Sequence, residues 1–140
     1  MACRERSADP FGPVSGSRIY SSQGLQVTHN APPNGGGSYV NEYTLMMDIM
    51  FPSVNVWAGL YQTNTGNTND GDWFVNPNNG IGIGGNYDGE IIAGTWHRIG
   101  LVVEPSSTGS SYRKYIDGVE VDVQGSADAT DGRFSLDPVF

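Results

Sequence analysis

The stretch from Asn64 to Asp72 gathers side chains whose oxygen atoms could bind a metal ion. Ca²⁺ prefers carboxylate and amide oxygens, and the closely spaced donors here are Asn69, Asp70 and Asp72. The stretch lacks the ligand spacing and the final Glu of an EF-hand. Asn and Asp also favour ordinary turns, because their side chains accept hydrogen bonds from the nearby backbone. The sequence therefore leaves two interpretations open, a Ca²⁺ site or a polar turn.

Three aromatic side chains, those of Trp57, Tyr61 and Trp73, could stack on a ligand. A flat aromatic surface with polar groups at its edge suits a sugar ring, which presents both C–H and hydroxyl groups. If the predicted strands 43–51 and 54–63 pair, Trp57 and Tyr61 share a face with Asp48, which would supply a polar contact. The alternative is that these rings pack in the core, because Trp and Tyr are mostly buried in small domains.

The sequence shows no arrangement of residues that is typical of an enzyme. Glycosidases use two carboxylates ~5 to 9 Å apart, whereas Asp48 is the only acid on its predicted strand. Neither His29 nor His97 accompanies a Ser or Cys in a recognisable nucleophile motif. The glycine-rich run 80–85 lacks the helix that a dinucleotide-binding turn needs, and 86–89 is predicted to be another turn. We therefore expect a protein without enzymatic activity.

The length and the charge of the chain limit the number of domains and the kinds of partner that we expect. The 140 residues suffice for one domain with a single core. A net charge of −8, with only seven Lys and Arg, would repel nucleic acid and anionic membrane surfaces. No apolar run is long enough to span a membrane, and the first residues lack the apolar stretch of a signal peptide. The lone Cys3 excludes an intrachain disulfide.

Alternating apolar residues predict strands, and no stretch has the spacing of an amphipathic helix. The clearest strand is 43–51, where one face begins at Tyr43 and is apolar while the other carries Asp48. In the next predicted strand, 54–63, both faces are partly apolar. One of them is favoured as the core face: Val54, Val56, Ala58 and Leu60.

Turn residues predict two hairpins. Asn79-Gly80 marks the tip of the first, and Asp117-Gly118 marks the second, because Asp and Gly tolerate the positive φ of a type I′ turn. A further strand, 96–103, alternates apolar residues between them. Many short strands separated by turns predict an all-β sandwich or barrel.

Two phrases on these strands resemble the laminin G-like and concanavalin A-like lectin and glucanase superfamily. They are TWHRI at 95–99 and YIDGV at 115–119, which match the tryptophan-led strand and the hairpin of that group. The segments 43–49 and 60–63 are also similar to bacterial laminin G-like modules of secreted proteins. The resemblance covers about residues 24–136.

This resemblance implies a jelly-roll sandwich of two antiparallel sheets that binds carbohydrate or glycoprotein without catalysis. It also implies Ca²⁺ on a rim loop, and a place outside the cell or on its surface as one module of a larger bacterial protein. The alternative is a structural or assembly domain that contacts other proteins through its sheet edges.

Domains of that group usually continue for one or two strands past the position that matches Phe140. We expect residues 1–18 to be a polar leader and 19–140 to be a sandwich that lacks its last strand or strands. An open sheet edge can pair with another chain. We therefore expect a homodimer, or strand exchange that involves residues 1–20.

Overall fold

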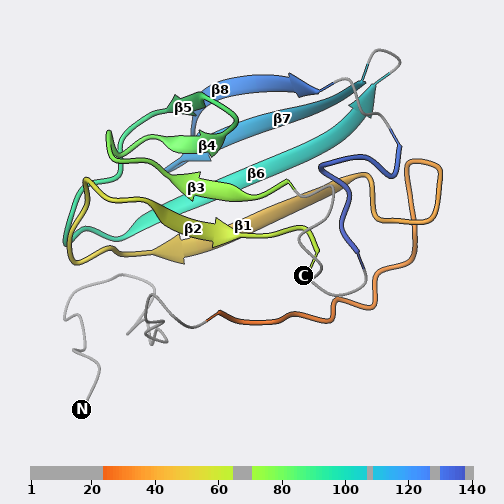
Figure 1. Cartoon of the computed structure of the whole chain (residues 1–140), viewed down its shortest axis with the longest axis horizontal. Coiled ribbons are helices and arrows are strands. Elements are labelled where there is room, and N and C mark those ends of the chain that lie inside the picture. Colours follow the sequence, from red (N-terminus) through yellow and green to blue (C-terminus); the bar gives the residue numbers. More distant parts are fainter. Residues whose placement is uncertain (1–23, 65–70, 107–108, 127–129, 138–140) are drawn as a thin grey trace.

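The chain folds into two antiparallel β-sheets that lie face to face (Figure 1). This computed structural model describes residues 24–64, 71–106, 109–126 and 130–137. Within those ranges there is no helix, and so none that could cross a membrane. The predictions of an all-β protein and of two antiparallel sheets are confirmed.

Each sheet has four strands. The large sheet consists of β1 (Tyr43–Ile49), β6 (His97–Ser106), β7 (Gly109–Ile116) and β8 (Val119–Ser126), in that spatial order. The small sheet is a meander of β2 (Ala58–Tyr61), β3 (Trp73–Val75), β4 (Ile81–Ile83) and β5 (Asn86–Asp88). The chain therefore leaves the large sheet after β1, builds the small sheet, and returns for its last three strands.

A single apolar core fills the space between the sheets. Trp73 and Val75 of β3 are 1% and 2% exposed, and Leu101 of β6 is 1% exposed. The ring of Trp73 meets that of Tyr112 in β7, with centroids 5.8 Å apart, and this contact joins the two sheets. Burying an apolar side chain of this size stabilises a fold by roughly 1.5–3 kcal/mol.

Two of the strand predictions are confirmed. In β1, Leu45 and Met47 pack against the core, whereas Met46 points outward and is 67% exposed. The hairpin at Asp117-Gly118 joins β7 to β8, and its two turn residues have φ of 53° and 84°. Their positive φ is the reason that Asp and Gly stand there.

The prediction for 54–63 is wrong in part. The strand is only β2, and it pairs with β3. Three residues of the predicted core face pack against the core, namely Val54, Ala58 and Leu60, whereas Val56 is 54% exposed. A register shift between Gly59 and Tyr61 inserts an extra residue, so both Ala58 and Tyr61 face the core. A bulge breaks the alternation on which the prediction rested.

The prediction of a turn at 86–89 is also wrong. Residues 86–88 form β5, and the turn lies just before it, at Gly84 and Gly85, whose φ values are 62° and 95°. The predicted hairpin at Asn79-Gly80 does join β3 to β4, and Asn79 has φ of 70°.

The two ends of the described chain are held together around one carboxylate. Asp131 accepts hydrogen bonds from the backbone N–H groups of Ser38 at 2.6 Å and Tyr39 at 2.9 Å. Beside it, Val40 and Leu136 exchange two backbone hydrogen bonds. These bonds attach the strand-free segment before β1 to the segment after β8.

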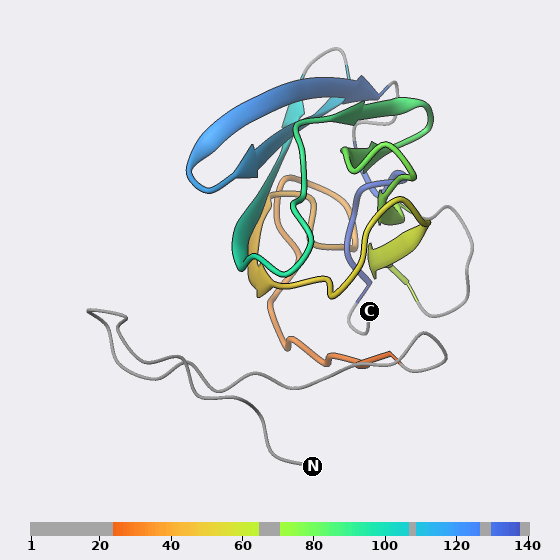
Figure 2. The same ribbon diagram turned by 90° about the vertical axis from the view of Figure 1, so that its left-hand side faces the viewer.

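The predicted leader, 1–18, and the predicted strand exchange by residues 1–20 lie outside the described residues. Both sheets end in strands with one unpaired edge within the described ranges, namely β1 and β8 in the large sheet and β2 and β5 in the small one (Figure 2).

The Asp131 carboxylate should make stability pH-dependent. The N–H groups of Ser38 and Tyr39 hold the pKa of Asp131 below its ordinary value of 3.8. A depressed pKa in the folded state contributes stability above the ordinary pKa, and this is lost as pH falls through the folded value. Asp131→Asn should therefore lower the melting temperature at neutral pH, and its deficit relative to wild type should shrink below about pH 4.

Thermal melts from neutral to acid pH would measure this difference. Ser38→Ala is the control, because it keeps the backbone N–H that Asp131 accepts and should melt like wild type. A deficit of Asp131→Asn that stays the same at every pH would contradict the expected role of the charge.

Candidate functional site

The outer face of the small sheet carries a row of alternating glycine and aromatic residues. Because Trp73 and Val75 face the core, Phe74 between them must face outward. The strand register places Gly59, Phe74, Gly82 and Tyr87 opposite one another across four strands. The two glycines have no side chains beside Phe74 and Tyr87, and the rings of both residues are partly buried on this face.

Trp57, just before β2, completes this surface. Its ring lies 6.1 Å from that of Phe74 and 5.4 Å from that of Tyr87, centroid to centroid, with interplanar angles of 88° and 74°. Edge-to-face pairs of this kind are worth ~0.5–1.5 kcal/mol each beyond the area that they bury. They hold Trp57 against the sheet although its side chain is 60% exposed. We call Trp57, Phe74 and Tyr87 the outer aromatic cluster.

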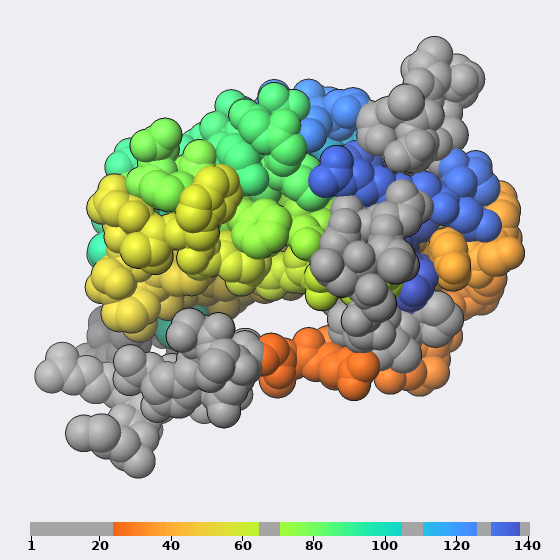
Figure 3. All heavy atoms as spheres, in the orientation of Figure 1, coloured from red at the N-terminus to blue at the C-terminus, as the bar shows by residue number. Residues whose placement is uncertain are grey.

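The loop that presents Trp57 is anchored to the turn between β3 and β4. Asn55 has φ of 67°, donates its backbone N–H to the side chain of Asn79, and donates from its own side chain to the carbonyl of Pro77. The segments that carry the outer aromatic cluster form one continuous yellow and green surface in Figure 3. The cluster is thus fixed from two sides, by its loop and by the sheet below.

The outer aromatic cluster offers stacking and hydrogen bonding rather than charge. Partial burial raises the pKa of the Tyr87 hydroxyl, more than the nearby Arg133 lowers it. The phenol therefore stays neutral and can both donate and accept a hydrogen bond. None of the three rings brings a formal charge, so the surface suits a neutral ligand with an apolar face.

The structure brings only one of the predicted aromatic residues to this surface. Trp57 is exposed, but Trp73 is 1% exposed and Tyr61 packs against it, with ring centroids 6.3 Å apart. The Tyr61 hydroxyl lies 2.9 Å from that of Tyr43, which donates to the carbonyl of Phe134. Burial raises the pKa of Tyr61 well above its usual range. The expected platform of three rings is therefore wrong for Tyr61 and Trp73, which belong to the core.

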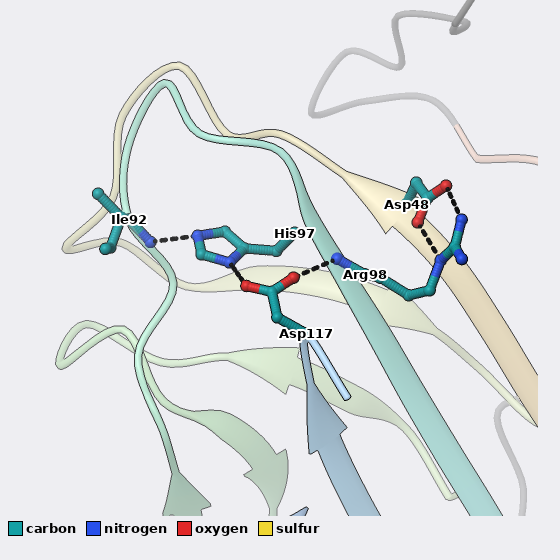
Figure 4. Close-up of polar contacts among 5 residues, drawn as sticks. All are labelled: Asp48, Ile92, His97, Arg98 and Asp117. Carbon is teal, nitrogen blue, oxygen red and sulfur yellow. Dashed lines mark hydrogen bonds and ion pairs between the residues drawn. The ribbon is translucent and has the colours of Figure 1, made fainter. Parts of the chain in front are cut away.

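Asp48 lies on β1 of the large sheet, whereas Trp57 precedes β2 of the small sheet. Its carboxylate accepts two hydrogen bonds from Arg98, both at 2.8 Å (Figure 4), and both side chains are exposed to solvent. The prediction that Asp48 shares a face with Trp57 and Tyr61 is wrong, because β1 and β2 belong to different sheets. Its acceptor positions are already in use by a guanidinium.

His97 and Asp117 form the pair that most resembles catalytic machinery (Figure 4). His97 Nδ1 lies 2.7 Å from Asp117 Oδ2, and His97 Nε2 accepts the backbone N–H of Ile92 at 3.0 Å. This pattern fixes the neutral tautomer with its proton on Nδ1, and the Nε2 lone pair is already engaged. Asp117 also accepts the N–H of Arg98 at 2.8 Å. The pair ties the hairpin turn to the start of β6 and leaves His97 no lone pair for use as a general base.

Of the three predicted Ca²⁺ ligands, the structure describes only one. Asn69 and Asp70 lie outside the described residues, and Asp72 is half-buried next to β3. Among the described residues there is no group of three or more His, Cys, Asp or Glu side chains that could hold a metal ion.

Two residues of the outer aromatic cluster were not predicted as site residues. Phe74 alternates with Trp73 and Val75, but a three-residue strand is too short for the alternation to show which face points inward. Tyr87 could not be assigned a face, because the segment that carries it was predicted to be a turn. Its orientation depends on pairing with β4, which the sequence does not reveal.

The hydrogen bonds of Asp117 predict a measurable loss on substitution. Burial alone would raise the pKa of Asp117, but bonds from the Arg98 N–H and from His97 outweigh it and lower the pKa. Asp117→Asn keeps a residue that tolerates the turn, yet an amide cannot accept both bonds. It should lower the free energy of unfolding by about 1–2 kcal/mol in urea melts.

Asp48→Asn is the matched control, since it removes a carboxylate that pairs with Arg98 at the exposed surface. Exposed pairs are worth less than about 1 kcal/mol. Equal losses in the two variants would contradict the structural role given to Asp117.

We compared the chain with protein families, curated sequences and solved structures. A scan against protein-family models, a search of curated protein sequences and a search of solved structures each found no match to this chain.

Proposed function

We propose that this domain is a non-catalytic recognition module that binds carbohydrate through the outer aromatic cluster. The observation that carries the proposal is the exposure of Trp57, which is 60% accessible while its edge contacts with Phe74 and Tyr87 hold it in place. A large ring that is both fixed and exposed suits stacking on a sugar, whose C–H groups form an apolar face.

The polar surroundings of the cluster support the same role. Tyr87 belongs to the row of rings, and the turn that anchors the Trp57 loop carries Asn76 and Asn79, whose side-chain oxygens accept backbone N–H groups and thereby fix the turn. Amides and hydroxyls are the groups that fix the orientation of a sugar by hydrogen bonds. With a net charge of −8, neutral glycans are favoured over sulfated or uronic ones.

We also propose the jelly-roll topology of the laminin G-like and concanavalin A-like group for this sandwich. In support, the two phrases that carry the resemblance fall on corresponding elements: TWHRI leads into β6, and YIDGV forms the hairpin between β7 and β8. The proposal of a module without catalysis is supported by the two engaged acids described above, since Asp117 binds His97 and Asp48 binds Arg98.

Binding should depend on Trp57. The fluorescently labelled protein would first be applied to an array of neutral and acidic glycans, and the strongest neutral oligosaccharide would then be titrated by calorimetry. Trp57→Ala should weaken binding at least tenfold, about 1.4 kcal/mol, because it removes the exposed stacking face.

Met46→Ala is the matched control, because Met46 is 67% exposed but lies on the opposite sheet, and its substitution should leave the affinity unchanged. If folded wild-type protein retains no glycan, or if Trp57→Ala binds as tightly as wild type, the proposal fails.

A further inference from the structure

One lysine lies completely inside the sandwich. Lys114 of β7 is 0% exposed, and its Nζ lies 2.8 Å from Asp88 Oδ2, 2.9 Å from Asp122 Oδ2 and 3.1 Å from the carbonyl oxygen of Asn86. Lysine is almost never fully buried unless it is paired. Here the three protons of one ammonium have three acceptors, and two of these carry negative charge.

The group joins both sheets. Asn86 and Asp88 belong to β5 of the small sheet, whereas Lys114 and Asp122 belong to β7 and β8 of the large one. β5 lies beside β8 in both views of the fold (Figures 1 and 2). A reaction within this group would therefore attach one sheet to the other.

We propose that Lys114 and Asp88 condense to an intramolecular isopeptide bond, with Asp122 relaying the proton. The amine is aimed at β5, since two of its three acceptors are the Asn86 carbonyl and the Asp88 carboxylate of that strand. This makes Asp88 the electrophile and leaves Asp122, on the neighbouring strand β8, as the acid and base.

The step balances without any further reagent. The Lys114 ammonium passes one proton to the Asp88 carboxylate, and the neutral Nζ attacks Asp88 Cγ to form the C–N bond. Asp122 takes a second proton from the nitrogen and delivers it to the departing hydroxyl, so the C–O bond breaks and water leaves. One proton remains on the amide nitrogen. Asp122 ends as a carboxylate, and the net charge of the group is unchanged.

Two physical effects favour the product. Burying an ammonium costs several kcal/mol unless its partners repay it, and the amide removes this charge together with that of Asp88. Holding the reacting groups in contact corresponds to effective molarities of ~10⁵ M or more, which opposes hydrolysis by bulk water. The Asp88 side chain is 40% exposed, so the water released has a way out.

The mass of the intact, denatured protein tests the proposal directly. The wild-type chain should be lighter than its sequence by one water molecule, and tandem mass spectrometry should find the peptide of Lys114 joined to that of Asp88. A chain at its full sequence mass, or a bond to another residue, would overturn the proposal. Lys114, Asp88 and Asp122 would then form ion pairs without a covalent bond.

A loss of water has one competing source in this sequence. Asp88 precedes Gly89, and Asp-Gly pairs can also lose water by cyclising to a succinimide. Lys114→Arg separates the two: arginine keeps the charge but does not form the bond, so it should restore the full mass, whereas a succinimide would persist in this variant. Persistence of the loss in Lys114→Arg overturns the isopeptide.

Two further variants identify the electrophile and the relay. With Asp88→Asn, the same bond would form with loss of ammonia instead of water, because an amide is then the electrophile. Asp122→Ala should abolish or strongly slow the reaction while Lys114 and Asp88 remain. The mass of the wild-type protein is measured first, so this main result does not depend on whether a variant folds.

Discussion

The contact between Trp73 and Tyr112 is the interaction on which the two-layered structure and its candidate site depend. It joins β3 of the small sheet to β7 of the large one at the centre of the core. A strand presents successive side chains to opposite faces, so fixing Trp73 inward fixes Phe74 outward. The register then aligns Phe74 with Gly59, Gly82 and Tyr87 on the outer surface. The proposed recognition surface is thus the outer side of the same pairing that builds the core.

Several acidic side chains stabilise the loops and turns that join the strands. Asp131 binds backbone N–H groups at the junction of the two chain ends, and Asp117 binds His97 and the N–H of Arg98 at the hairpin. Charge-assisted bonds of this kind are roughly twice as strong as neutral ones. A chain with short strands and many turns has many N–H groups outside its ladders, and carboxylates satisfy some of them. Part of the excess of acids is thus explained by backbone N–H groups that need an acceptor.

Regular alternation made β1, β6 and the hairpin after β7 predictable, because each is long enough to show its period or carries a turn signal with a steric cause. The three-residue strands β3, β4 and β5 have no period to detect. The bulge in β2 reverses the face of Tyr61, and only the pairing partner reveals a bulge. Lys114 was equally hidden, since its burial depends on Asp88, a residue distant in sequence that approaches only when the sheets stack.

The short strand β5 links the two proposals physically. It turns Tyr87 outward to the aromatic cluster and Asp88 inward to Lys114. A three-residue edge strand has few ladder bonds of its own, and strands of that length are rarely stable alone. The attachment through Lys114 compensates for this, because it fixes β5 to the large sheet from inside. A ring that is already immobile loses little entropy when a ligand stacks on it, so the buried lysine group would prepare the outer surface for the proposed binding.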